Sequence, residues 1–210
     1  MVTLYSSPGT AGLVVHWLLI DLGIPHELRM LDFEKREHKT PEYLAINPNG
    51  VVPTLVIDGL AIFESPAIAM HLADAHPDAK LAPAVGSMDR AEFYQWFFFM
   101  ANFMQPAYRL WFYAAEGAGE ANIEDTKAQA RGRIESGWTT LDKHLAANGP
   151  YLLGERLSVA DFMMTMLMRW SRNMPKPAHT WPALAEHAKR MKARPSFREV
   201  YAREGLTDWT

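Results

Sequence analysis

The chain has 210 residues, a formal net charge of −3 and no cysteine. Its 49% apolar and 21% charged residues are typical of a globular protein and exclude a disordered chain. The mixed charges argue against a broad basic surface for nucleic acid or anionic lipid, and the absence of cysteine excludes disulfides, thiolate nucleophiles and cysteine-ligated metals.

The N-terminal region alternates between strand and helix patterns. Residues 2–6 are β-branched and aromatic and stop at a Ser-Pro-Gly turn, which predicts a strand. Apolar residues at helical spacing predict a helix over 13–22 that ends at a Gly-Ile-Pro segment. Residues 26–31 predict a second strand, so a β-α-β unit begins the chain.

A hairpin and a helix complete this region. Thr40 is expected to cap a short helix that a proline opens. Residues 54–57 and 61–63 are joined through Asp-Gly, which adopts the positive φ values of a tight turn and therefore predicts a hairpin. A further helix is expected over 64–75. The predicted order over residues 1–78 is β-α-β-α-β-β-α, an α/β domain.

The next segment is predicted to be a linker before long helices. Residues 76–86 contain two prolines and no sustained periodicity. Beyond them, the pattern predicts a helix from residue 87 or 89 to about 113, kinked at Pro106, and another from 122 to 147.

Three more helices are predicted near the C-terminus. A Ser-x-x-Asp sequence at 158–161 is a capping-box variant that predicts a helix start. Two further helices are expected at about 181–193 and 195–203. The sequence therefore predicts an all-α helical bundle domain over residues 87–210.

The sequence lacks the motifs of common metal and nucleotide sites. The sequence contains no HExxH, GxxxxGK[ST] or GxGxxG pattern and no closely spaced His and carboxylate ligands, so no metal or nucleotide site is expected. No basic stretch precedes an apolar run at the N-terminus, and the apolar runs are shorter than a membrane span. A cytoplasmic location is therefore expected, with no membrane or nucleic-acid partner.

Two segments carry a family resemblance. The order of elements, Asn-Pro-Asn-Gly-Val-Val-Pro-Thr-Leu at 47–55 and Phe-Glu-Ser-Pro-Ala-Ile at 63–68 resemble the cytosolic glutathione S-transferases over nearly the whole chain. The resemblance is to bacterial members of the serine/threonine or atypical type, related to the beta, theta and delta classes. It implies a thioredoxin-like domain before the helical domain, glutathione as co-substrate and a homodimer.

The resemblance implies a cis peptide bond before Pro53. Such a bond turns the backbone sharply, so Val52 would expose its N–H and C=O to a ligand that pairs like an added strand. Taken alone, Pro53 is better explained by a turn or a strand edge without a ligand role, and the surrounding segment reverses this preference.

Glu64 and Ser65 stand at a predicted helix start, where unpaired N–H groups and the positive end of the helix dipole favour an anion. The resemblance implies that Ser65 holds the γ-glutamyl carboxylate of glutathione and that Glu64 faces its ammonium group. A helix cap at Ser65 and a favourable charge at Glu64 explain the same residues without a ligand.

His38 and Asn49 are expected at the glycyl end of glutathione. His38 looks like the histidine that some serine-type members use there, although Lys35 or Lys39 could contact that carboxylate instead. Family members often carry a basic or amide side chain at the position of Asn49 or Gly50, and Gly50 removes one of these contacts.

Transfer chemistry requires the glutathione thiolate, because a thiol with a pKa of about 8.5 is mostly protonated at neutral pH. Tyrosine-type members place their phenol where this chain has Ser6, and Tyr5 should point to the opposite face of its strand. Cysteine-type members place their sulfur where this chain has Ala11.

Thr10 is therefore the first candidate to stabilise the thiolate, because it follows Pro-Gly where serine-type members carry their hydroxyl. A charge-assisted hydrogen bond is worth roughly 1.5–3 kcal/mol, or about one to two pKa units. Ser6 and Ser7 are rivals, the backbone at 11–12 could contribute, and Thr10 could also be an ordinary helix cap.

The helix expected up to residue 113 has more aromatic residues than one buried stripe requires. By their position in the family, Tyr108, Trp111 and Phe112 would face the second substrate, and Arg109 could meet a polar group. Core packing or subunit contacts explain the same rings.

The expected function is glutathione transfer: the thiol of glutathione is activated as thiolate and attacks a small hydrophobic electrophile. One alternative is a non-catalytic binding or protein-association module, which the missing tyrosine and cysteine permit. Another is a glutathione-dependent isomerase or dehalogenase, which would differ in the electrophile pocket.

Overall fold

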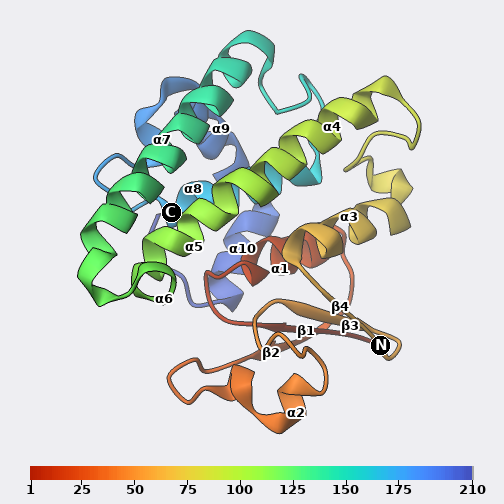
Figure 1. The fold of residues 1–210 in the computed structure, drawn as a ribbon. Coiled ribbons are helices and arrows are strands. Elements are labelled where there is room, and N and C mark those ends of the chain that lie inside the picture. Colours follow the sequence, from red (N-terminus) through yellow and green to blue (C-terminus); the bar gives the residue numbers. More distant parts are fainter. Residues whose placement is uncertain (210) are drawn as a thin grey trace. The chain divides into compact units, whose positions relative to one another are not determined.

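The computed structural model describes residues 1–209, except for the side chains of residues 117 and 118. The chain divides into two compact units (Figure 1). The first comprises Met1–Ala82 and Lys192–Thr210, and the second comprises Pro83–Met191.

The first unit is built on a four-stranded mixed sheet in the order β2-β1-β3-β4. β1 runs parallel to β2 and antiparallel to β3, and β3 and β4 form a hairpin through Asp58 and Gly59, both with positive φ. This arrangement confirms the predicted strands and hairpin. The strands are β1 (Val2–Ser6), β2 (Glu27–Met30), β3 (Thr54–Ile57) and β4 (Leu60–Phe63).

Helices cover both faces of this sheet. α1 and α3 lie on one face and the short α2 on the other (Figure 1). α2 begins as predicted, because the Thr40 side chain accepts a hydrogen bond from the Tyr43 N–H. The helices of this unit are α1 (Gly12–Asp21), α2 (Pro41–Leu44), α3 (Ser65–Ala75) and α10 (Pro195–Arg203).

The C-terminal helix differs from the sequence-based expectation. The helical pattern places residues 195–203 in the domain 87–210, whereas α10 packs on α1 within the first unit. Trp17 explains the difference: its indole N–H donates to the Ser196 hydroxyl at 2.9 Å, and its ring packs edge-on against Phe197. Helical periodicity reveals a buried face but not its partner.

The second unit is helical, and α8 forms its core with every residue from Val159 to Arg169 buried. Pro106 lies in the first turn of α5, directly after a π-helical stretch at Met100–Met104. Since proline lacks an N–H and its ring crowds the preceding turn, a wider turn accommodates it. The helices are α4 (Met88–Phe99), α5 (Gln105–Phe112), α6 (Ala114–Ala118), α7 (Ile123–Asn148), α8 (Val159–Trp170) and α9 (Pro182–Lys192).

The predicted capping box at the start of α8 is confirmed. Asp161 Oδ2 accepts hydrogen bonds from the Ser158 N–H at 2.8 Å and the Ser158 hydroxyl at 3.0 Å. Its Oδ1 accepts one from the Leu152 N–H at 2.9 Å and lies 3.1 Å from His187 Nε2. Within the described part of the chain, no helix has the length and apolar character to span a membrane.

Candidate functional site

Three chain segments leave the sheet of the first unit at one edge. Thr54 of β3 pairs with Tyr5 of β1 on one side and with Phe63 of β4 on the other. β3 is antiparallel to both neighbours, so the turn after β1, the loop before β3 and the start of α3 all lie just beyond this row. The candidate residues Thr10, Val52 and Ser65 come from these three segments.

The loop before β3 contains the expected cis peptide bond between Val52 and Pro53. Its neighbouring carbonyl, Val51 O, accepts hydrogen bonds from the Tyr43 hydroxyl at 2.7 Å and from Asn47 Nδ2 at 2.9 Å. Val51 itself is exposed and Val52 half-buried, whereas Tyr43 and Asn47 are buried. Buried side chains therefore hold an accessible stretch of backbone.

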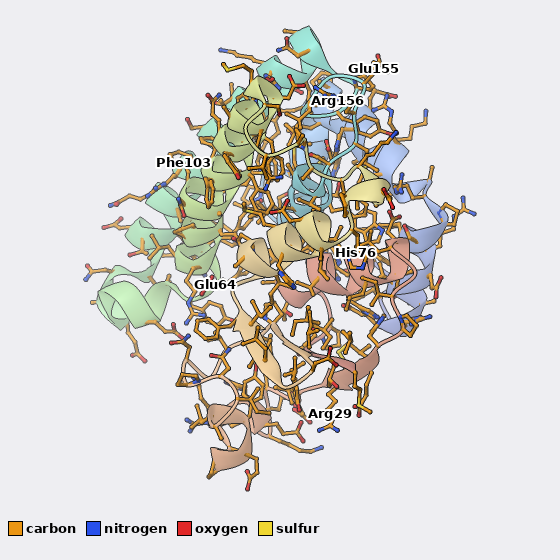
Figure 2. All side chains as sticks on the ribbon, turned by 90° about the vertical axis from the view of Figure 1, so that its right-hand side faces the viewer. Arg29, Glu64, His76, Phe103, Glu155 and Arg156 are labelled. Atoms are coloured by element: carbon orange, nitrogen blue, oxygen red, sulfur yellow. The ribbon has the colours of Figure 1, made fainter. Side chains whose placement is uncertain are left out.

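Glu64 precedes α3 with φ 70° and ψ 107°. Backbone in this region costs a non-glycine residue about 1–3 kcal/mol and is found where the surrounding structure imposes it. Figure 2 shows the exposed Glu64 side chain at the start of α3, and the next residue, Ser65, is buried. The eleven-residue α3 directs its first N–H groups and positive dipole end toward this point.

The three candidate hydroxyls after β1 differ in accessibility. Ser6 is fully buried against α1, where a Cβ on Gly12 would come within 1.9 Å of its Oγ. Ser7 is also buried. Thr10 is half-buried, and its Oγ1 donates to Ser7 O at 2.7 Å and lies 3.4 Å from the Gly12 N–H. Thr10 is thus the most accessible of the three.

A buried carboxylate supports this turn from the far end of the chain. Glu204, which follows α10, accepts a hydrogen bond from the Gly9 N–H at 2.8 Å. Its other oxygen lies 2.9 Å from His16 Nδ1, and both side chains are fully buried. The last helix therefore fixes the turn in which Thr10 stands.

His38, Lys39 and Asn49 lie close together beside the loop before β3. A Cβ on Gly50 would lie 2.9 Å from both His38 O and Lys39 Nζ, and Lys39 Nζ donates to Asn49 O at 3.4 Å. The Lys39 ammonium thus occupies the space that a side chain at position 50 would need. Lys35 instead pairs with Asp32 at 3.1 Å.

The His38 ring packs against Phe33 with 4.4 Å between ring centroids. Burial, followed by the nearby positive charges of Lys39 and Arg36, lowers the pKa of His38. A neutral imidazole is therefore favoured at neutral pH. Among the described residues, no group of three or more His, Asp or Glu side chains is placed to hold a metal ion.

Comparison with known proteins identifies the family. The model of the glutathione S-transferase N-terminal domain matches residues 1–74, and that of the C-terminal domain matches residues 124–203. A sphingomonad glutathione S-transferase, solved in complex with glutathione, is 31% identical, with a TM-score of 0.85 over 98% of this chain and 100% of that one. The chain belongs to the glutathione S-transferase family.

Two further relatives support this membership over the full length. The glutathione S-transferase GST-4.5 of Xanthomonas campestris pv. campestris is 29% identical over 97% of this chain and 98% of its own. A glutathione transferase homologue from Sulfitobacter, solved with bound glutathione, is 27% identical, with a TM-score of 0.90 over 99% of both chains. Both domains of this glutathione S-transferase therefore have counterparts in its relatives.

The aromatic residues of the transferase's helical unit separate into core and surface. Tyr108 is fully buried, and its hydroxyl accepts a hydrogen bond from the Trp138 indole at 3.1 Å. This placement differs from its predicted role facing a second substrate. Phe112 is 49% exposed, and Trp111 is partly exposed. Arg109 pairs with Glu116, so the polar group suggested for the pocket is already engaged.

Sequence reasoning missed the residues that support the transferase's loops. Asn47 belongs to the segment that carries the family resemblance, but the motif does not reveal that its side chain binds the Val51 carbonyl. Glu204 is separated from Gly9 by 195 residues, and no local pattern links them. No sequence signal could have drawn attention to Glu204, because its burial just after the last helix arises only in the folded unit.

Proposed function

We propose that this transferase binds glutathione at the sheet edge of its first unit and activates the thiol as thiolate for attack on a small hydrophobic electrophile. The observation that carries the proposal is the shared edge at which the Thr10 turn, the Val52 loop and the Ser65 helix start emerge. A tripeptide lying along this edge would meet all three segments.

Each part of glutathione has a chemical partner in this assignment. The backbone of Val52, beside Pro53, pairs with the cysteinyl residue like an added strand. Ser65 and the start of α3 hold the γ-glutamyl carboxylate, and Glu64 faces the ammonium group. The strained backbone at Glu64 supports a ligand role for this position.

The glycyl carboxylate is assigned to His38, Lys39 and Asn49. Lys39 supplies the positive charge, since its ammonium occupies the space beside Gly50. Because its pKa is lowered, His38 is expected to act as a neutral hydrogen-bond donor.

Thr10 is assigned as the thiolate-stabilising residue, in preference to the more buried Ser6 and Ser7. Its hydroxyl cannot act as a base near neutral pH. By rotating away from Ser7 O it can donate to a thiolate, a bond worth roughly 1.5–3 kcal/mol. The first N–H groups of α1 add to this stabilisation.

The electrophile is assigned to the exposed aromatic surface that includes Trp111 and Phe112. Large, partly exposed rings offer an apolar compound favourable contact area. Tyr108, by contrast, is fully buried and stacks on Phe112 with 6.0 Å between ring centroids. As expected for a member of this family, we also propose that the protein acts as a cytoplasmic homodimer.

Calorimetry with glutathione tests the site directly. Ser65→Ala should weaken binding by about 1–3 kcal/mol, as expected for a lost hydrogen bond to a charged group. The matched control is Ser87→Ala, because Ser87 caps α4 by accepting from the Arg90 N–H. The control should lower stability and leave affinity unchanged.

Unchanged affinity in Ser65→Ala, with only a stability loss, would reduce Ser65 to a helix cap. If wild-type protein binds glutathione but an ultraviolet titration finds no thiolate near neutral pH, the non-catalytic alternative is favoured.

A further inference from the structure

Three buried side chains surround the Val51 carbonyl in a closed hydrogen-bonded ring. Tyr43 Oη and Asn47 Nδ2 contact Val51 O at 2.7 and 2.9 Å. Thr54 Oγ1 closes the ring, 2.8 Å from Tyr43 Oη and 3.0 Å from Asn47 Nδ2. Asn47 and Thr54 are 0% exposed and Tyr43 is 3% exposed, so little water competes for these bonds.

The ring has one consistent set of hydrogen positions. Asn47 Nδ2 has two protons, one for Val51 O and one for Thr54 Oγ1. The Thr54 hydroxyl then donates to Tyr43 Oη, and the Tyr43 hydroxyl donates to Val51 O. Burial raises the pKa of Tyr43, which keeps its phenol protonated as a donor. Every donor in the ring has an acceptor.

Fixing the Val51 carbonyl also fixes the next amide. The peptide bond between Val51 and Val52 is trans, so its C=O and N–H point in opposite directions in one plane. Because the buried ring draws Val51 O inward, the N–H of Val52 must point outward.

We propose that Tyr43, Asn47 and Thr54 are positioning residues that aim the Val52 N–H at the cysteinyl carbonyl of bound glutathione. The proposal rests on the proposed function, since it specifies how the glutathione-binding backbone is held. None of the three side chains needs to touch glutathione, because they act through the Val51–Val52 peptide plane.

Tyr43→Phe removes one hydroxyl from the hydrogen-bonded ring and preserves the packing of the aromatic side chain. Glutathione affinity by calorimetry should fall about tenfold, equivalent to one ordinary hydrogen bond. Hydrogen exchange at the Val52 amide, followed by ¹⁵N NMR, should be protected by glutathione in the wild type and much less in the variant. The thiol pKa of glutathione that remains bound should be unchanged.

Tyr5→Phe is the matched control. Tyr5 packs against Tyr43 with 5.6 Å between ring centroids, but its hydroxyl accepts from Arg29 outside the ring of hydrogen bonds. Thr54→Val is the second variant, and the Tyr43→Phe and Thr54→Val effects on affinity should be non-additive if the ring acts as a unit.

The outcomes distinguish a failure of glutathione binding from a failure of the positioning role. If wild-type protein takes up no glutathione, the proposed function fails. If the wild type binds and Tyr43→Phe binds equally well with unchanged Val52 exchange, even at lower melting temperature, the ring merely stabilises the loop and the positioning role is overturned.

Discussion

The two units both bury polar side chains but use them differently. In the sheet unit, Asn47 and Glu204 bind backbone groups of loops at the edge where the candidate site lies. In the helical unit, Asp161 caps a helix and Tyr108 bonds within the aromatic core. Burial of a polar group therefore does not by itself mark a functional site. The informative feature is whether the buried group holds an accessible backbone segment.

The largest effect is expected from removing a buried polar side chain of the helical unit, which has no part in the candidate site. Asp161→Ala removes the acceptor for Leu152 and Ser158 and leaves His187 buried without its carboxylate. The free energy of unfolding, measured by denaturant titration, should fall by about 3–5 kcal/mol, because removing one partner of a buried pair leaves the other uncompensated.

The control for this variant is Asp89→Ala. Asp89 pairs with Arg156, and both side chains are exposed. Arg156 is labelled in Figure 2. Exposed pairs contribute at most about 1 kcal/mol. A comparable loss in both variants would show that the buried Asp161 network contributes little.

The second variant removes Glu204, the buried carboxylate that accepts a hydrogen bond from the turn of the candidate site. Glu204→Ala should lower the unfolding free energy by about 3 kcal/mol, because the Gly9 N–H and His16 both lose a buried partner. It should also raise the thiol pKa of bound glutathione, since the Thr10 turn is released. Denaturant titration and ultraviolet titration measure the two effects.

Glu204→Gln is the matched comparison, because an amide can still accept from Gly9 and donate to His16. It should restore most of the stability and the thiol pKa. Glu199→Ala, which removes an exposed pair with Arg203 on the same helix, should change neither. A thiol pKa that stays constant in Glu204→Ala would leave Glu204 an architectural role only, like that of Asp161.

The smallest expected effect concerns the reacting group itself. Thr10→Ala should raise the thiol pKa of bound glutathione by about one to two units, with affinity for glutathione nearly preserved. Thr10→Ser keeps the hydroxyl and should behave like the wild type. If Thr10→Ala leaves the ultraviolet titration unchanged, the backbone N–H groups of α1 are the principal stabiliser.

Much of the fold was predictable because its signals are local. Strand β1, the hairpin at Asp58-Gly59 and the capping box at Ser158 each depend on residues a few positions apart. The candidate site was predictable in outline, since Val52, Pro53 and Ser65 lie in segments that resemble a family. The aromatic residues of α5 were less tractable, because helical spacing alone does not tell Tyr108 in the core from Phe112 at the surface.

From the chain alone one can predict the order of elements over residues 1–78, the helix caps and the segments typical of the glutathione S-transferase family, because each depends on neighbouring residues. The helix α6 and the π-helical stretch between α4 and α5 were not predicted. The tertiary structure alone decided that α10 packs on α1, that Glu204 holds Gly9, and that Tyr43 and Thr54 close a ring around Val51 O. These contacts join residues from different elements, and only packing of the whole unit removes the water that would otherwise satisfy their hydrogen bonds.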